Sequence, residues 1–376
     1  MRRTFFQRSF SAARAIGPVM LAGALISGGL HSASASPAVL VDLGTGKVLE
    51  QEDAFAPWYP ASLTKLMTTL VLFRAIKAGE ITLASPIRIS ERAAKEPPSK
   101  MGYKPGSVLT VDNAIKILMV KSANDVASAI AESLTGSRAT FVARMNAEAA
   151  RLGMTDTHFV NPHGLHDDKQ TTTVRDLAVL GMALRNEFPQ YAHYYSIEAL
   201  QDGDKRIDNH NDLILRFQGA DGMKTGYTCP SGFNLAATAS RNGRNLLVVV
   251  IGEPTVEARA DKAANMLARG FATPGDDAPY LGQLRPTGKE AASAVNLRPV
   301  ICTQEHWKKV EATRGPQGKP LYTSPYLSKE LLHERQVVAI GLGGATGPKP
   351  DVPQYADVPI PTPRPDYQPQ TIVQGG

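Results

Sequence analysis

The feature that most constrains the fold of this 376-residue chain is an uncharged, mainly apolar run, Leu66 to Phe73, that closely follows Ser62 and Lys65. Such a run predicts a buried helix, and Gly79 is a suitable stop for it. Ser62 and Lys65 are three positions apart at the start of this helix, so their side chains share one face. Burial lowers the pKa of a lysine, and a neutral lysine beside a serine is a base beside a nucleophile. The same spacing also occurs on ordinary surface helices, where both side chains are solvated.

Composition limits the classes of function. The chain is 43 % hydrophobic and 20 % charged, which is a globular balance, and its length suits one large domain or two smaller ones. Four arginines in the first 36 residues supply four of the six net positive charges, which leaves +2 for the rest. This weak excess, with no basic stripe, argues against binding of nucleic acid.

The N-terminus has the pattern of an export signal. Basic residues come first, then an apolar run from Ile16 to Leu30, then the small-residue site Ala33 to Ala35. We therefore predict a signal peptide over residues 1–35 and a mature protein in the periplasm or at the cell-wall exterior. The run is short and interrupted by glycines, which argues against an uncleaved anchor, and no later run suggests a transmembrane helix. Because Arg2 to Phe6 also resembles a twin-arginine signal, the export route stays open.

Strand-like segments lie on both sides of a mainly helical stretch, roughly 110–190. This order predicts an α/β (α+β) fold with one antiparallel sheet flanked by helices and an all-helical lobe. Asn242-Gly243 is a two-residue hairpin signal between the last two strands. The predicted strands are Ala38–Leu43, Lys47–Glu50, Ile87–Ser90, Ser107–Thr110, Met223–Thr228, Phe233–Ser240 and Arg244–Gly252, and the predicted helices after the first are Val111–Val120, Asp125–Leu134, Ala139–Leu152 and Thr255–Phe271.

The C-terminal quarter is patterned more weakly. We predict a domain over 36–275, a small segment over 276–345 and a disordered or extended tail over 346–376, where eight of 31 residues are proline. Short strand-like pieces within the segment are Val295–Leu297 and Val337–Ile340. The two cysteines, Cys229 and Cys302, lack the spacing of a metal cluster or redox pair, and one disulfide is possible after export.

Two further motifs carry polar side chains. Ser122-Ala123-Asn124 lies at a predicted helix junction, where a hydroxyl and an amide two positions apart can reach one cleft; helix capping is the simpler interpretation. Lys224-Thr225-Gly226 lies within a predicted strand, where glycine permits close approach to the backbone. A cation and a hydroxyl beside it suit a carboxylate, although an edge strand with a solvated lysine would look the same.

Taken together, S-x-x-K, S-x-N and K-T-G in this order resemble the penicillin-recognising serine acyltransferases. The chain is most similar to the D-alanyl-D-alanine carboxypeptidases, the low-molecular-weight penicillin-binding proteins, over roughly 37–275. The segments 159–165 and 219–228 also read like stretches of this family. The resemblance implies a β-lactamase/transpeptidase-like fold and a hydrolase that removes the terminal D-alanine from peptidoglycan pentapeptides through an acyl-enzyme. It also implies inhibition by β-lactam antibiotics and no cofactor or metal.

The resemblance further implies a role for each site residue. Ser62 is the nucleophile and Lys65 its base, and Ser122 with Lys224 passes the proton to the departing D-alanine. Oxyanion donors would be the backbone N–H groups of Ser62 and Tyr227. The remaining substrate-binding residues are Asn124 for the peptide amide, Gly226 for close approach, and Thr225 with Arg259 for the terminal carboxylate, where Arg241 and Arg269 are alternatives to Arg259.

Other functions remain in view. A D,D-endopeptidase that cuts peptidoglycan cross-links uses the same motifs, as does a β-lactamase, and a wall-binding protein without activity is a third class. Class A β-lactamases place a deacylating carboxylate in an E-x-x-L-N segment, which is absent between Asn124 and Lys224. The carboxylates in that interval have other contexts: Glu132, Glu148, Glu187 and Glu198. We interpret His158, His163 and His166 as loop residues, because no zinc-helix spacing is present.

Overall fold

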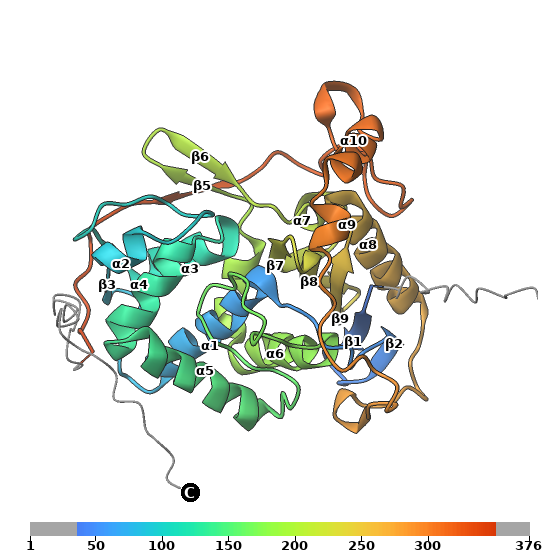
Figure 1. Ribbon diagram of the computed structural model, residues 1–376, viewed down its shortest axis with the longest axis horizontal. Coiled ribbons are helices and arrows are strands. Elements are labelled where there is room, and N and C mark those ends of the chain that lie inside the picture. The colour runs from blue at the N-terminus through green and yellow to red at the C-terminus, as the bar shows by residue number, and fades with distance from the viewer. Residues whose placement is uncertain (1–35, 351–376) are drawn as a thin grey trace, which may run out of the picture. The chain divides into compact units, whose positions relative to one another are not determined.

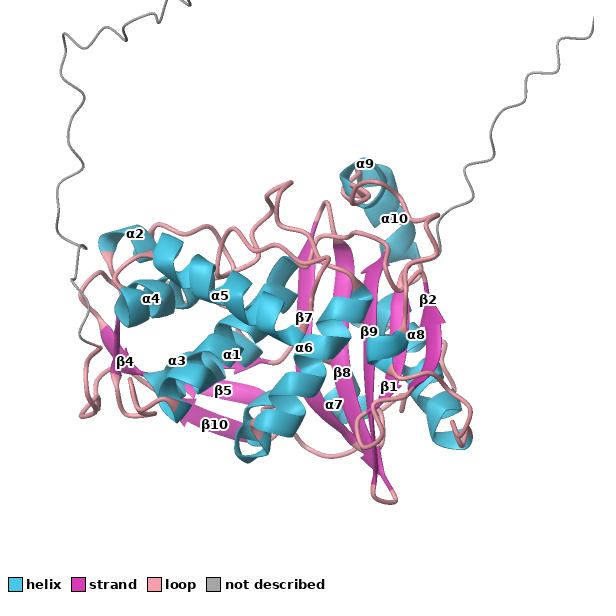
Figure 2. Cartoon of the chain, turned by 90° about the horizontal axis from the view of Figure 1, so that it is seen from below, coloured by secondary structure: helices cyan, strands magenta, loops and turns pink. Residues whose placement is uncertain are grey.

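The computed structural model describes residues 36–350, so the predicted signal peptide and the tail from residue 351 lie outside the described residues. A five-stranded antiparallel sheet with the strand order β2-β1-β9-β8-β7 forms the centre (Figure 2). The N-terminal hairpin lies at one edge, and β7 forms the other. The strands are β1 (Ala38–Asp42), β2 (Val48–Glu52), β7 (Ala220–Thr228), β8 (Gly232–Arg241) and β9 (Arg244–Glu253).

Helices cover both faces of this sheet. The closing helix α8 (Val256–Ala272) packs on one face against β8, β9 and β1, and α6 (Val174–Glu187) packs on the other. Each face buries its own apolar cluster. Thr255 caps α8 by accepting a hydrogen bond from the Ala258 N–H at 3.0 Å, which fixes where this helix begins.

The helical lobe lies beside the β7 end of the sheet (Figure 1). The helix α1 (Thr64–Lys77) is buried on nearly every side, as its apolar run predicts. Around it stand α2 (Glu91–Ala94), α3 (Val111–Val120), α4 (Asn124–Thr135) and α5 (Arg138–Leu152). Gly136 and Gly153 end α4 and α5 in the left-handed conformation. The short strands β3 (Pro86–Arg88) and β4 (Val108–Thr110) form a separate antiparallel pair.

The C-terminal segment follows the outside of this core. It contains α9 (Arg298–Ile301), α10 (Gln304–Ala312) and β10 (Val337–Ile340). The strand β10 pairs in parallel with β5 (Ala199–Asp202), which itself pairs with β6 (Lys205–Asp208). The backbone then bonds to Val108 from Gly343 and to Ala84 from residues 346 and 347, so the segment crosses from the α8 side of the sheet to the helical lobe. The short helix α7 (Leu213–Arg216) leads into β7.

The structure confirms the predicted sheet and the helical lobe, but one predicted strand is wrong. Residues 295–297 form no strand: Leu297 donates a backbone hydrogen bond to the Pro230 carbonyl and is the N-cap of α9, which begins at Arg298. The hairpin β5–β6 and the helix α10 were not predicted. Connecting segments of the chain contain the 3-10 helices η2 (Pro189–Ser196), η3 (Leu281–Gln283) and η4 (Pro316–Gly318).

The two cysteines form a disulfide. Cys229, directly after β7, is joined to Cys302, directly after α9, so the bridge ties the C-terminal segment to the end of the edge strand. Beside the bridge, Trp307 packs edge-on against Phe233 with ring centroids 6.4 Å apart. Between residues 36 and 350, no helix has the length and hydrophobicity needed to cross a bilayer.

Replacing both cysteines by serine is expected to lower the free energy of unfolding by about 2–4 kcal/mol, because the bridge closes a long loop in the unfolded chain. The measurement is urea unfolding of the wild type and of the double variant Cys229→Ser/Cys302→Ser. Thiol counting on denatured, non-reduced protein from the periplasm is the control, and two free thiols there would contradict the bridge.

Candidate active site

Ser62 lies in a single 3-10 turn, η1 (Ala61–Leu63), that runs directly into α1. Ala61, the residue before it, has φ +47°, a conformation that non-glycine residues rarely adopt. Two glycines press against this turn from opposite sides. A Cβ atom on Gly164 would lie 1.8 Å from the Ala61 carbonyl oxygen, and one on Gly226 would lie 3.1 Å from the Ser62 nitrogen. Backbone packing that excludes a Cβ atom at Gly164, and leaves little room for one at Gly226, therefore supports the turn.

Lys65 is completely buried and faces three oxygen atoms. Its Nζ lies 2.8 Å from Asn124 Oδ1 and 2.5 Å from the His163 carbonyl oxygen. The third neighbour is Ser62 Oγ at 3.2 Å. The Asn124 amide has a defined orientation, because its Nδ2 donates to the Pro97 carbonyl at 2.9 Å.

These three contacts can satisfy Lys65 in either protonation state, because an ammonium would donate to all three oxygens. The oxygens of Asn124 and His163 only accept hydrogen bonds, so they take both N–H groups of an uncharged amine. In this neutral form the lone pair is left for the Ser62 hydroxyl, which has a proton to donate. Burial lowers the pKa of Lys65 well below its usual value, and the positive charge of Lys224 lowers it further, while Asp125 and Glu96 oppose this effect. Lys65 is thus placed to accept the Ser62 proton.

Ser122 lies in the turn between α3 and α4, with φ +60°. Its Oγ is buried and has no hydrogen-bond partner among the described residues. Neither Ser122 nor Asn124 caps α4, since Ala123 occupies the cap position and the helix has no side-chain cap. The capping interpretation is therefore wrong, and a strained residue with an unpaired hydroxyl is typical of a functional site.

Lys224 is on the edge strand β7, but it is only 1 % exposed, so the solvated-lysine interpretation is wrong. Its Nζ donates to the Thr225 carbonyl at 2.8 Å. Burial, and to a lesser degree the charge of Arg259, lowers the pKa of Lys224 to about 7. Thr225 is buried on the same strand, and Tyr227, which is 37 % exposed, stacks on Phe233. The strand contacts both η1 and α3, so the Ser62, Ser122 and Lys224 motifs converge.

Arg259 of α8 is 4 % exposed. It donates to the carbonyls of His210 at 3.2 Å and Asn234 at 3.5 Å, and its buried Nε has no partner among the described residues. A buried guanidinium held by carbonyls alone is short of negative charge, which suits an incoming carboxylate. The two alternative arginines are engaged elsewhere: Arg241 lies over two phenylalanine rings, and Arg269 pairs with Glu50.

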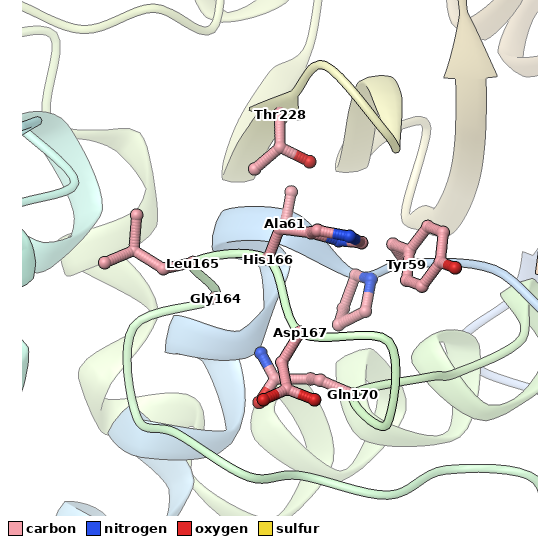
Figure 3. A pocket seen from close by; sticks show the side chains of 9 residues that line it. Tyr59, Ala61, Gly164, Leu165, His166, Asp167, Gln170 and Thr228 are labelled. Carbon is pink, nitrogen blue, oxygen red and sulfur yellow. The ribbon is translucent and has the colours of Figure 1, made fainter. Parts of the chain in front are cut away.

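A small crevice opens beside the Ser62 turn (Figure 3). Tyr59 and Ala61 line it from that turn, Thr228 from the end of β7, and His166 and Asp167 from the loop after α5. The crevice thus lies between the residues that precede Ser62, the end of β7 and the loop that contains Gly164.

Two residues at this site were not assigned a role from the sequence. The His163 carbonyl bonds to Lys65, and the buried carboxylate of Glu96 lies 3.6 Å from the His163 ring. A backbone carbonyl leaves no trace in the side-chain pattern, so only the likeness of segment 159–165 to the family pointed here. In the described part of the chain, no group of three or more His, Cys, Asp or Glu side chains is arranged to hold a metal ion.

Comparison with known proteins identifies the family of this chain. The family model described as D-alanyl-D-alanine carboxypeptidase matches residues 27–255. The D-alanyl-D-alanine carboxypeptidase DacF of Bacillus subtilis is 34 % identical over 63 % of this chain. The alignment covers 62 % of DacF, so the chain spans about three fifths of that relative's length.

Solved structures share the fold, which is the α/β transpeptidase-like arrangement predicted from the sequence. Penicillin binding protein 5 from Haemophilus influenzae superposes with a TM-score of 0.61 and 33 % identity, covering 64 % of this chain and 71 % of that one. Penicillin-binding protein D2 from Listeria monocytogenes, in its ampicillin-bound form, gives 0.58 and 28 %, covering 63 % and 98 %.

Gly164→Ala is expected to lower the free energy of unfolding by about 2–5 kcal/mol, because it adds overpacking against Ala61 to the strain of a positive φ. The matched control is Gly106→Ala, whose φ is also positive but whose Cβ meets nothing within 4 Å. It should lose only about 1–2 kcal/mol. Chemical denaturation compares the two, and equal losses would show that the Gly164 contact is unimportant.

Proposed function

Because the chain belongs to the Peptidase S11 family of D-alanyl-D-alanine carboxypeptidases, we propose that it removes the terminal D-alanine from peptidoglycan pentapeptides through an acyl-enzyme on Ser62. The observation that carries this proposal is the environment of Lys65. Its buried amine lies beside two oxygens that only accept hydrogen bonds and 3.2 Å from Ser62 Oγ, so in its neutral form it can accept the Ser62 proton.

In the first step, Ser62 Oγ bonds to the carbonyl carbon of the D-Ala-D-Ala peptide, and its proton passes to Lys65 Nζ. The electron pair of the carbonyl double bond moves to the oxygen, and this oxyanion accepts hydrogen bonds from the backbone N–H groups of Ser62 and Tyr227. The pair returns as the C–N bond breaks, and Ser122 with Lys224 delivers a proton to the departing amine. The unpaired Ser122 hydroxyl supports this role, since it needs a partner that the free protein does not provide.

Substrate binding follows from the same residues. Thr225 and Arg259 bind the terminal carboxylate, and Gly226 lets the substrate backbone approach β7. Asn124 orients Lys65, and it reaches the substrate amide by exchanging its bond to the Pro97 carbonyl. Water then hydrolyses the acyl-enzyme. The reaction takes place in the periplasm or at the cell-wall exterior, after the signal peptide, residues 1–35, has been removed.

β-Lactams acylate the same serine and leave it slowly. The related protein D2 has a solved structure in an ampicillin-bound form, which supports binding here. Rapid deacylation needs a carboxylate free to activate water. Glu148 and Glu187 pair with Arg74, Glu132 accepts from Ser90, and Glu198 accepts from the Gln336 N–H. These engagements favour a penicillin target over a β-lactamase.

Intact-protein mass spectrometry with benzylpenicillin tests the assignment of nucleophile and base. We expect one adduct on the wild type and none on Ser62→Ala. Lys65→Arg keeps the positive charge but cannot release its proton, so acylation should slow by roughly 10³-fold, within the range for loss of a general base. A Ser62→Ala protein that still forms the adduct would exclude Ser62, and near-normal acylation of Lys65→Arg would exclude Lys65 as the base.

Arg259→Ala tests recognition of the carboxylate. A charge-assisted hydrogen bond contributes about 1.5–3 kcal/mol, so kcat/KM for release of D-alanine from a pentapeptide should fall roughly 10–150-fold. A depsipeptide or amide substrate without the terminal carboxylate should be much less affected, because it never makes this contact.

Arg269→Ala is the matched control, since Arg269 lies on the same helix but pairs with Glu50 at the surface. If Arg259→Ala slows both substrates by one factor, the side chain supports α8 instead of reading the carboxylate. Release of D-alanine from a pentapeptide, compared with cleavage of a cross-linked dimer, separates the carboxypeptidase from the D,D-endopeptidase.

A further inference from the structure

A buried carboxylate stands behind the proposed base. Glu96 lies in the loop after α2 and is 8 % exposed. Its Oε1 accepts a hydrogen bond from Ser128 of α4 at 2.8 Å and pairs with Arg138 of α5. Its Oε2 lies 3.6 Å from Nε2 of His163, which is also buried. Two helices, α4 and α5, thus hold one carboxylate against one imidazole.

The His163 ring is held in one protonation state. Its Nδ1 accepts a hydrogen bond from the Leu165 N–H at 3.1 Å, so Nδ1 has no proton, and the ring proton is on Nε2, which faces Glu96. Burial lowers the pKa of His163, and the charges of Lys65 and Arg138 lower it further against the opposing effect of Glu96. A neutral imidazole therefore bridges Glu96 and the backbone of Leu165.

This bridge controls the acceptor of Lys65. The His163 carbonyl accepts from Lys65 Nζ, and the adjacent Pro162 carbonyl accepts from Thr68 at 2.6 Å. The turn closed by the His163 ring contains Gly164, which presses against Ala61. Movement of the ring would therefore move both the carbonyl that holds the base and the turn that supports the nucleophile.

Glu96 also contributes charge. The groups that act on Lys65 are Lys224 from β7, Asp125 from α4 and Glu96 from the loop after α2. Asp125 is already occupied by the N–H groups of Met101 and Gly102. Burial opposes ionisation of Glu96, but hydrogen bonds from His163 and Ser128 together with the charge of Arg138 outweigh it and lower the pKa of Glu96 to about 2. Glu96 is therefore ionised throughout the working range of the enzyme.

We propose that Glu96 is a positioning residue for Lys65, which fixes the His163 turn and sets, by its negative charge, the lowest pH at which Lys65 serves as base. The proposal rests on the function proposed above, in which neutral Lys65 accepts the Ser62 proton. Acylation should then rise with pH as Lys65 loses its proton. Removing the negative charge of Glu96 favours the neutral amine of Lys65, so the increase of the acylation rate with pH should occur at lower pH.

The test is the second-order rate of acylation by benzylpenicillin between pH 5 and 9 at constant ionic strength. Glu96→Gln keeps the shape of the side chain and removes its charge. We call the part of the rate profile that rises with pH its acidic limb. In Glu96→Gln we expect this limb to shift to lower pH by about 0.5–1 pH unit, somewhat less than the effect of a directly contacting charge. Glu132→Gln is the matched control, because Glu132 accepts from Ser90 and does not act on Lys65, and its limb should not move.

Arg138→Gln gives the opposite sign. It removes the cation beside Glu96 but leaves the carboxylate, so the negative charge acts more strongly on Lys65 and the limb should move up. A purely structural role would lower the plateau rate in both variants without shifts of opposite direction. Unchanged limbs in Glu96→Gln and Arg138→Gln, with normal acylation of the wild type, would overturn the proposal.

Thermal melting identifies a variant that does not fold. If Glu96→Gln is unfolded, Arg138→Gln alone decides: an upward shift supports the proposal and an unmoved limb overturns it. Failure of the wild type to form any adduct would instead overturn the proposed function, and this inference with it.

Discussion

The structure depends on shielding the amine of one lysine, Lys65, from water. A fully buried ammonium is unfavourable unless charges or hydrogen bonds replace its hydration, and Lys65 has no carboxylate in direct contact among the described residues. Burial and the charge of Lys224 therefore favour the neutral amine, whose two N–H groups bond to the oxygens of Asn124 and His163. Water is excluded by α1, which is buried almost all round, by the loop at Gly164 and by β7 at Gly226. The helical lobe and the sheet therefore have to pack closely around Ser62, and the missing side chains of Gly164 and Gly226 allow this close packing.

Charge is divided across the site. On the side of the helical lobe, Asp125 and Glu96 stabilise a positive Lys65, whereas on the side of the sheet Lys224 destabilises it. Lys224 is itself destabilised by burial and by Arg259. Lys224 and Arg259 are both buried and donate hydrogen bonds to backbone carbonyls only, a setting that suits a ligand with a carboxylate. The same repulsion that favours a neutral base thus favours an anionic substrate, so binding and proton transfer draw on one electrostatic arrangement.

The sequence was informative where local pattern and burial agree. The run Leu66–Phe73 predicted α1, Asn242-Gly243 predicted the turn between β8 and β9, and the three motifs were placed on the correct kinds of element. It failed where the determining contact is made by the backbone or by distant segments. The His163 carbonyl is one such case. Glu96 is another, because nothing in its neighbourhood distinguishes it from a solvated surface glutamate until α4 and α5 pack around it.

The C-terminal segment shows the same limit more strongly. In α10, Val310 is the one fully buried residue, so the helix carries no apolar stripe from which it could be predicted. The strand β10 alternates between exposed and half-buried positions and gains its order from pairing with β5. The segment is anchored by a disulfide at one end and by backbone bonds to Val108 and Ala84 at the other. Since the first anchor adjoins Tyr227 and the second lies on the helical lobe, the segment links the two halves whose contact buries Lys65.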